Sequence, residues 1–158
     1  MSDLASLVSR TLGLLHAKGV NQCAAICFRP GENGETLVLL ISSRGTKRWV
    51  VPKGMLEPGE KPHKGAEREA GEEAGISGKA DKGAIGYYTY VKEIGDPPYI
   101  VSVFLLRVTS VAKHFREAGQ RQCVWVSPAE AATMVREPEL KSIFRRFATQ
   151  VSSIKSLT

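Results

Sequence analysis

Residues 54–76 read GMLEPGEKPHKGAEREAGEEAGI, and this stretch decides the fold of the chain. It follows, without a gap, the pattern of a glycine, five residues, a glutamate, seven residues and then Arg-Glu-apolar-x-Glu-Glu-x-Gly-apolar. The fixed positions are Gly54, Glu60, Arg68, Glu69, Glu72, Glu73 and Gly75. If each fixed residue type has a background frequency of roughly 0.07, seven accidental matches have odds of about 10⁻⁸ per starting position. Chance therefore does not explain the pattern.

Three glutamates in this stretch predict a cation site. Glu69, Glu72 and Glu73 are spaced i, i+3 and i+4, so on an α-helix they share one face within about 6 Å of axial rise. Carboxylates this close repel one another and raise each other's pKa unless cations lie among them. Their oxygens suit Mg²⁺ or Mn²⁺, and Mg²⁺ completes its shell with waters and phosphate oxygens. A solvated acidic helix face is the alternative, which the complete pattern disfavours.

The same stretch predicts a helix from about Pro62 to Ala74. Proline is tolerated in the first helical turn, where its missing N–H is not needed. Gly75 is well placed to end the helix in a left-handed conformation. Arg68 is positioned to pair with Glu60 in the preceding loop or with Glu72 one turn later, which would brace the loop against the helix.

The bulk properties indicate one domain. A chain of 158 residues is long enough to bury a proper core. It has no apolar run long enough to span a membrane and no secretory signal, so no membrane partner is expected. Cys23 and Cys27 on one strand would lie about 13 Å apart, too far for a disulfide. With Cys123 they are expected to be reduced thiols in a cytoplasmic protein.

The positive charge points to an anionic partner. The formal net charge is +6, which suits an anion or simply favours solubility. Arg44, Lys47, Arg48 and Lys53 lead into the glutamate-rich stretch, so they are predicted to hold the distal phosphates of a polyphosphorylated small molecule. Solvated loop cations are the alternative. Nucleic acid is not the expected partner, because no helix-turn-helix, zinc pattern or aromatic RNA-binding signature occurs. The sequence leaves the oligomeric state open.

Hydrophobic periodicity and turn signals place the remaining elements. Strands are expected over residues 22–29, 36–42, 84–91, 100–108 and 122–126, with a short apolar run at 49–51, and helices over 3–18, from Pro128 and from about Glu139. Mixed strands around a central loop–helix unit, with helices at both ends, indicate an α/β (α+β) sandwich. We divide the chain into a helical lead-in at 1–20, a single domain at 21–150 and a frayed tail at 151–158.

The pattern in residues 54–76 resembles the Nudix box of Mg²⁺-dependent hydrolases that cut diphosphate linkages. The flanks ISSRGTKRWVVPKGMLEPGE (41–60) and QRQCVWVSPAEA (120–131) are similar to the branch that contains diphosphoinositol polyphosphate and diadenosine polyphosphate phosphohydrolases. The resemblance covers residues 22–147 and implies a Nudix-type α/β/α sandwich with a mixed sheet. It departs from the branch at Gln122-Cys123, where two basic residues are common, and at Lys53, where a glycine is frequent.

The resemblance also implies roles for individual residues. Glu69 and Glu73 would be principal ligands of Mg²⁺ or Mn²⁺, together with a carbonyl near Gly54. Glu72 would be a further ligand, a ligand through water or a proton acceptor. The general base differs between Nudix members, and an acid on a later loop is one option. The later candidates here are Glu93, Asp96 and Glu117. We favour Glu117, because it precedes the QRQCVW segment in a loop expected to lie over the site.

Three functions follow as hypotheses. The first is a metal-dependent hydrolase that cleaves a diphosphate linkage in a dinucleoside polyphosphate or an inositol pyrophosphate. The second is an enzyme that removes a 5′ diphosphate or a cap from RNA. The third is a non-catalytic, ligand-sensing Nudix domain, which the complete set of carboxylates and the retained arginine disfavour.

Overall fold

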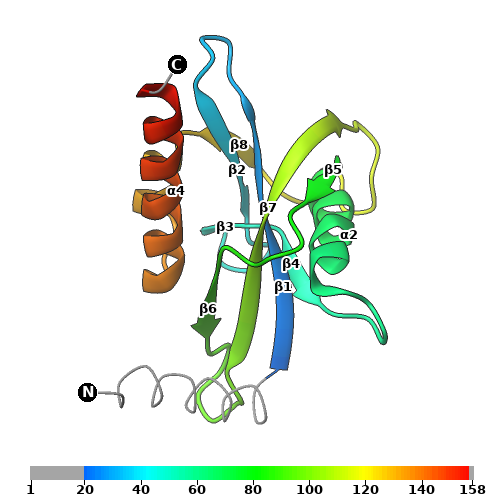
Figure 1. Cartoon of the computed structure of the whole chain (residues 1–158). Coiled ribbons are helices and arrows are strands. Elements are labelled where there is room, and N and C mark those ends of the chain that lie inside the picture. Colours follow the sequence, from blue (N-terminus) through cyan, green and yellow to red (C-terminus); the bar gives the residue numbers. More distant parts are fainter. Residues whose placement is uncertain (1–19, 157–158) are drawn as a thin grey trace, which may run out of the picture.

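A computed structural model describes residues 20–156 as an eight-stranded sheet with helices on both faces (Figure 1). The strands are β1 (Val20–Pro30), β2 (Thr36–Ser42), β3 (Trp49–Val50), β4 (Lys53–Met55), β5 (Ile76–Ala80), β6 (Gly86–Tyr90), β7 (Tyr99–Val111) and β8 (Cys123–Val126). The helices are α2 (Pro62–Ala74), α3 (Pro128–Met134) and α4 (Pro138–Ser156). The helix expected over residues 3–18 lies outside the described residues.

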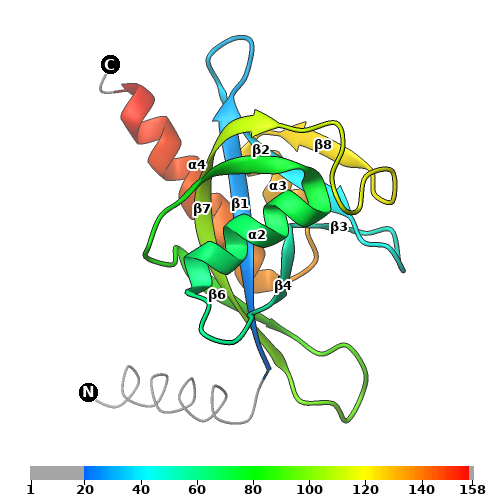
Figure 2. The same ribbon diagram turned by 90° about the vertical axis from the view of Figure 1, so that its right-hand side faces the viewer.

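The sheet is mixed, as predicted. Its main strand order is β3-β2-β1-β7-β5, with β8 paired to β2, β4 to β1 and β6 to β7. The central pair β1 and β7 is parallel, and every other pair is antiparallel. Figures 1 and 2 show α2 on one face of the sheet and α4 on the other. The architecture is therefore an α/β/α sandwich. None of these helices is both long and apolar enough to cross a bilayer.

Two apolar layers hold the sandwich together. Residues of β1 alternate between them, because successive strand side chains point to opposite faces: Ile26 packs toward α3 and α4, whereas Cys27 packs toward α2. On the α2 side the helix contributes only alanines, at Ala66, Ala70 and Ala74, all buried. Small side chains let the helix lie close to the sheet, so its glutamates emerge beside the sheet rather than far above it.

Several predicted elements agree with the structure and a few differ. The bounds of α2 and β2 are as expected, and the Ser127 hydroxyl caps α3 by accepting the Glu130 N–H at 3.1 Å. Strands β4 and β5 were not predicted. Helix α4 continues to Ser156, whereas a frayed tail was expected from residue 151. The first residue of this stretch, Val151, still packs against the core and favours continuation of the helix.

Candidate active site

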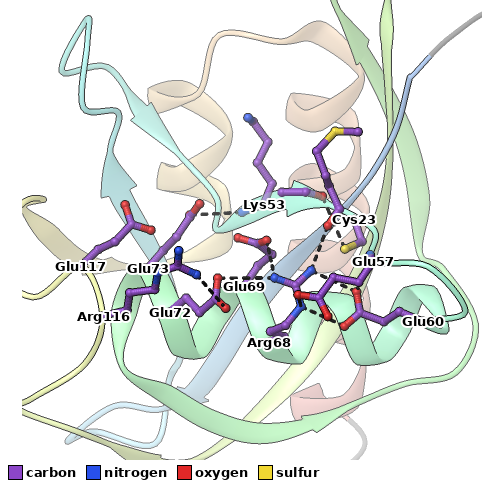
Figure 3. Close-up of polar contacts among 12 residues, drawn as sticks. Cys23, Lys53, Glu57, Glu60, Arg68, Glu69, Glu72, Glu73, Arg116 and Glu117 are labelled. Carbon is purple, nitrogen blue, oxygen red and sulfur yellow. Dashed lines mark hydrogen bonds and ion pairs between the residues drawn. The ribbon is translucent and has the colours of Figure 1, made fainter.

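Helix α2 presents the glutamates to the strand β4. The helix ends at Gly75, whose φ of 69° is left-handed and whose N–H donates to the Gly71 carbonyl at 3.0 Å. Glu69 and Glu73 are each only 8% exposed. A Cβ added to Gly54 would clash with the Glu69 carboxylate, so this glycine leaves room for the carboxylate in its present position against the β4 backbone. Figure 3 shows both side chains directed from the helix toward β4.

Burial makes these two acids costly to ionise. Loss of solvent raises the pKa of Glu73 to about 7; the neighbouring Arg121 lowers it and Glu69 raises it further. Loss of solvent also raises the pKa of Glu69, against the opposing effect of the Arg68 hydrogen bond. The negative charges of Glu72 and Glu117 raise the pKa of Glu69 further. An added cation would therefore be favoured beside this pair.

Arg68 braces the loop before the helix. Its Nε donates to Glu60 Oε2 at 2.9 Å, and its Nη2 donates to the Met55 carbonyl at 2.8 Å. Its Nη1 donates to Glu69 Oε1 at 2.8 Å and contacts Glu72 Oε2 at 3.4 Å. The hydrogen bond from Arg68 lowers the pKa of Glu60. The arginine thus makes both contacts that the sequence predicted and also orients one of the buried glutamates.

Glu72 occupies the outer edge of the acidic face. It lies 3.4 Å from Arg68 and 3.3 Å from Arg116, and its side chain is 26% exposed. In residues 20–156, no group of three or more His, Cys, Asp or Glu side chains is already arranged to hold a metal ion. The three glutamates therefore share a helix face, as predicted, but only Glu69 and Glu73 form a buried pair.

The donor set of this pair fits a divalent cation. Its members are carboxylate oxygens and the backbone of Gly54, which are the hard ligands that Mg²⁺ and Mn²⁺ prefer. Burial is the main cause of the raised pKa values of Glu69 and Glu73, so the charged forms of both carboxylates would gain from a cation bound between them. One donor to the pair is the Lys53 N–H, 3.3 Å from Glu73 Oε2.

Glu117 lies beside this pair, on the loop between β7 and β8. Its N–H donates to the Glu72 carbonyl at 3.0 Å, which ties the loop to α2. Figure 3 shows its carboxylate next to Glu73. Arg44 contacts the Glu117 carboxylate at 3.4 Å and is itself 61% exposed along its side chain. The structure thus places the favoured base candidate at the site, with a solvent-facing cation next to it.

Arg121 is a site residue that the sequence analysis missed. Its Nη2 lies 3.3 Å from Glu117 Oε1 and 3.5 Å from Glu73 Oε1, and its Nη1 donates to the Ser42 carbonyl at 3.1 Å. Its side chain is 10% exposed, and its buried Nε has no hydrogen-bond partner. The only sequence signal was its place in the QRQCVW segment, directly before Gln122-Cys123, where basic residues are common in the related branch.

The other predicted phosphate-binding cations do not converge. Lys53 Nζ donates to the Tyr90 hydroxyl at 3.0 Å, and in Figure 3 its side chain points away from the glutamates. Arg48 is held at 2.6 Å by the carboxylate of Glu137. Lys47 has a positive φ of 56° in the turn before β3. Of the four cations, Arg44 alone lies exposed beside a site carboxylate.

Comparison with known proteins agrees with this geometry. Residues 20–147 match the NUDIX domain family. The human protein "Diphosphoinositol polyphosphate phosphohydrolase 3-alpha" is 35% identical over 97 residues, which are 61% of this chain and 56% of that protein. The mouse "Diphosphoinositol polyphosphate phosphohydrolase 2" is also 35% identical, over 61% of this chain and 51% of its own length. The chain thus spans about half the length of the curated relatives that it matches.

Solved structures share the fold. The "C. elegans Ap4A Hydrolase Binary Complex" aligns with a TM-score of 0.64 at 22% identity, covering 85% of this chain and 98% of that one. A "NUDIX hydrolase from Nitrosomonas europaea" aligns with a TM-score of 0.66 at 23% identity, covering 85% and 91%. With the family match over residues 20–147, the complete box and the α/β/α architecture, the chain belongs to the Nudix family.

Proposed function

We propose that this protein is a divalent-metal-dependent hydrolase of the diphosphate linkage in a polyphosphorylated small molecule, such as a dinucleoside polyphosphate or an inositol pyrophosphate. The observation that carries the proposal is the buried pair Glu69 and Glu73 on one face of α2, pressed against β4. The names of the related phosphohydrolases support the same substrate class. Its three cysteines are free, in keeping with our proposal that it works in the cytoplasm.

Glu69 and Glu73 would hold the ion, and Glu72 and the Gly54 carbonyl are the further oxygens of the box that we propose as ligands. A bound Mg²⁺ or Mn²⁺ supplies charge neutralisation at the phosphoryl oxygens. Arg68 keeps the Glu69 carboxylate oriented through its 2.8 Å hydrogen bond. A diphosphate suits such a site because its own oxygens can complete the coordination shell of the ion.

Glu117 is our candidate for the proton acceptor. Its carboxylate is held by Arg121 at 3.3 Å, and its backbone is tied to α2. A carboxylate within reach of the attacking water can take its proton, which typically accelerates a reaction 10²–10⁴-fold. Arg44 is exposed beside Glu117 and forms an ion pair with it. When substrate binds, Arg44 would exchange this ion pair for a contact with a phosphate oxygen. Arg48 is less available, because Glu137 already engages it.

A substrate screen tests the proposal. The purified protein is incubated with nucleoside diphosphate sugars, dinucleoside polyphosphates, inositol pyrophosphates and triphosphorylated RNA, with Mg²⁺, Mn²⁺ or EDTA. We expect turnover of dinucleoside polyphosphates or inositol pyrophosphates that needs the metal. Preferential turnover of RNA would favour the 5′-processing alternative. Tight binding of a ligand with no turnover of any compound would favour a sensing domain and overturn the proposal.

A further inference from the structure

A second pocket lies on the opposite face of the sheet from the glutamates. It has a volume of about 630 Å³, which is within the range of small-molecule sites. Its apolar wall is formed by Phe28 of β1, Leu105 of β7, and Phe147 and Val151 of α4. These four side chains belong to the layer between the sheet and α4, whereas α2 packs on the other layer. The pocket is therefore separate from the candidate active site.

Three cations line this pocket: Lys79 from β5, Lys82 from the segment after it and Arg107 from β7. No carboxylate in the described part of the chain forms an ion pair with any of them. Asp81 is the only acidic side chain in the lining, so the lining has three positive groups and one negative, a formal charge of +2. Unpaired cations beside an apolar wall are suited to an anion that also has an apolar body.

Arg107 links the charged and apolar parts of the pocket. Its guanidinium lies over the Phe28 ring, 5.1 Å from the ring centre, and Phe28 in turn meets the edge of Phe147 at 5.5 Å. A guanidinium held in this way keeps its N–H donors free at its edge, where they can contact two phosphate oxygens. The aromatic rings of Phe28 and Phe147 beside the guanidinium can pack against a ring of the ligand.

We propose that this pocket binds an organic phosphate monoester with a compact ring body, of the class of nucleoside monophosphates. A phosphate monoester carries about −1.5 to −2 charges at neutral pH, which matches the +2 of the lining. The phosphate would lie between Arg107 and Lys82, and the ring body would lie on Leu105 and Val151. A ligand without the phosphate lacks the ionic contacts, and inorganic phosphate lacks the apolar ones.

The test is a titration followed by NMR. Isotope-labelled full-length protein in EDTA is titrated with adenosine 5′-monophosphate, with adenosine and with inorganic phosphate. We expect the monophosphate to shift the amide signals of residues 28, 79–82, 105–107 and 150, and to bind at least about tenfold more tightly than either fragment. Arg107→Ala and Lys82→Ala should each weaken binding at least about fivefold. Lys92→Ala, which removes the same charge from an exposed loop outside the pocket, should change binding less than about twofold.

The outcomes separate this pocket from the active site. Signal changes confined to α2 and the loop between β7 and β8 would overturn the proposal, as would equal affinity for adenosine and the monophosphate. Equal weakening by Lys92→Ala and Arg107→Ala would also overturn it, because it would show diffuse attraction. The titration needs neither a metal nor turnover. A failed titration therefore leaves the hydrolase proposal intact, and an inactive protein leaves the pocket proposal intact.

Discussion

At the scale of single residues, the burial of Glu73 makes the stability of the metal-free protein depend on pH. Its pKa rises from 4.5 in the unfolded chain to about 7 in the fold, so between these values the folded state binds more protons. The contribution of Glu73 to the free energy of unfolding is therefore largest below about pH 4.5. It falls by on the order of 2–3 kcal/mol as the pH rises through 7. Glu73→Gln should remove this part of the pH dependence, measured by urea unfolding in EDTA at pH 5 and pH 8. If stability depends on pH in the same way in the original protein and in Glu73→Gln, the pKa of Glu73 is not raised by burial.

The same residue carries the strongest prediction about activity. Replacing Glu73 by Gln removes the charge that would hold the metal and keeps the shape, so turnover should fall by about 100-fold or more while the circular dichroism spectrum stays unchanged. Glu32→Gln removes a carboxylate from the exposed turn between β1 and β2 and should leave turnover within about twofold. Comparable activity of the two variants would show that Glu73 is not a metal ligand.

The acidic site could be predicted from the sequence only where its residues are close along the chain. The spacing of Glu69, Glu72 and Glu73 was sufficient, because helical geometry alone puts them on one face. Arg121 was missed because its partners come from β2, α2 and its own loop. Arg48 was assigned to phosphate because its partner, Glu137, lies 89 residues further along the chain.

At the scale of the elements, two glycines inside α2 predict opposite effects of the same substitution. A Cβ at Gly65 would lie 2.6 Å from Cys23 Sγ and 3.0 Å from Leu56 Cδ2. At Gly71 the nearest atom, the Ile76 carbonyl oxygen, is 3.5 Å away, an ordinary contact. Gly71→Ala should therefore stabilise the protein by about 0.5–1 kcal/mol through helix propensity. Gly65→Ala should destabilise it by about 1–3 kcal/mol through overpacking.

Thermal and urea unfolding of these two variants measure the difference, and each variant is the control for the other. Both variants replace glycine by alanine in the same helix, so helix propensity alone would change the free energy of unfolding in the same direction. Equal stabilisation by both substitutions would show that α2 does not pack closely on β1 at Gly65.

The elements that were predicted correctly had local signals at their ends. Helix α2 has Pro62 at its start and Gly75 at its end, and both act within one turn. Strand β5 (ISGKA) was missed because its glycine and lysine interrupt the apolar alternation; its pairing with β7 is a tertiary effect. Strand β4 is three residues long, too short for periodicity to reveal. Helix α4 extends beyond its expected end, and Val151 within this stretch packs against the core, a tertiary contact that the local sequence does not reveal.

At the scale of the whole molecule, the ion pair between Arg48 and Glu137 joins distant parts of the sandwich. Arg48 directly precedes β3, and Glu137 directly precedes α4. The two side chains are 28% and 8% exposed, and the second oxygen of Glu137 is buried without a hydrogen-bond partner. The carboxylate thus depends on Arg48 for its neutralisation. The contact also fixes the segment that carries Arg44 relative to the helices on the far face.

A double-mutant cycle measures this dependence. Arg48→Met leaves the Glu137 carboxylate buried and unpaired, so it should lower the free energy of unfolding by about 3 kcal/mol or more at pH 7. Glu137→Leu alone should cost less, since the partly exposed Arg48 can turn toward water. The protein with both substitutions should regain most of the loss, because two apolar side chains can replace a buried ion pair without a large penalty. Urea unfolding of the four proteins gives the coupling free energy, which we expect to exceed about 1 kcal/mol. If the loss in the double mutant equals the sum of the two single losses within about 0.5 kcal/mol, the two groups do not act as a pair. Arg48 would then be free to bind phosphate, as the sequence predicted.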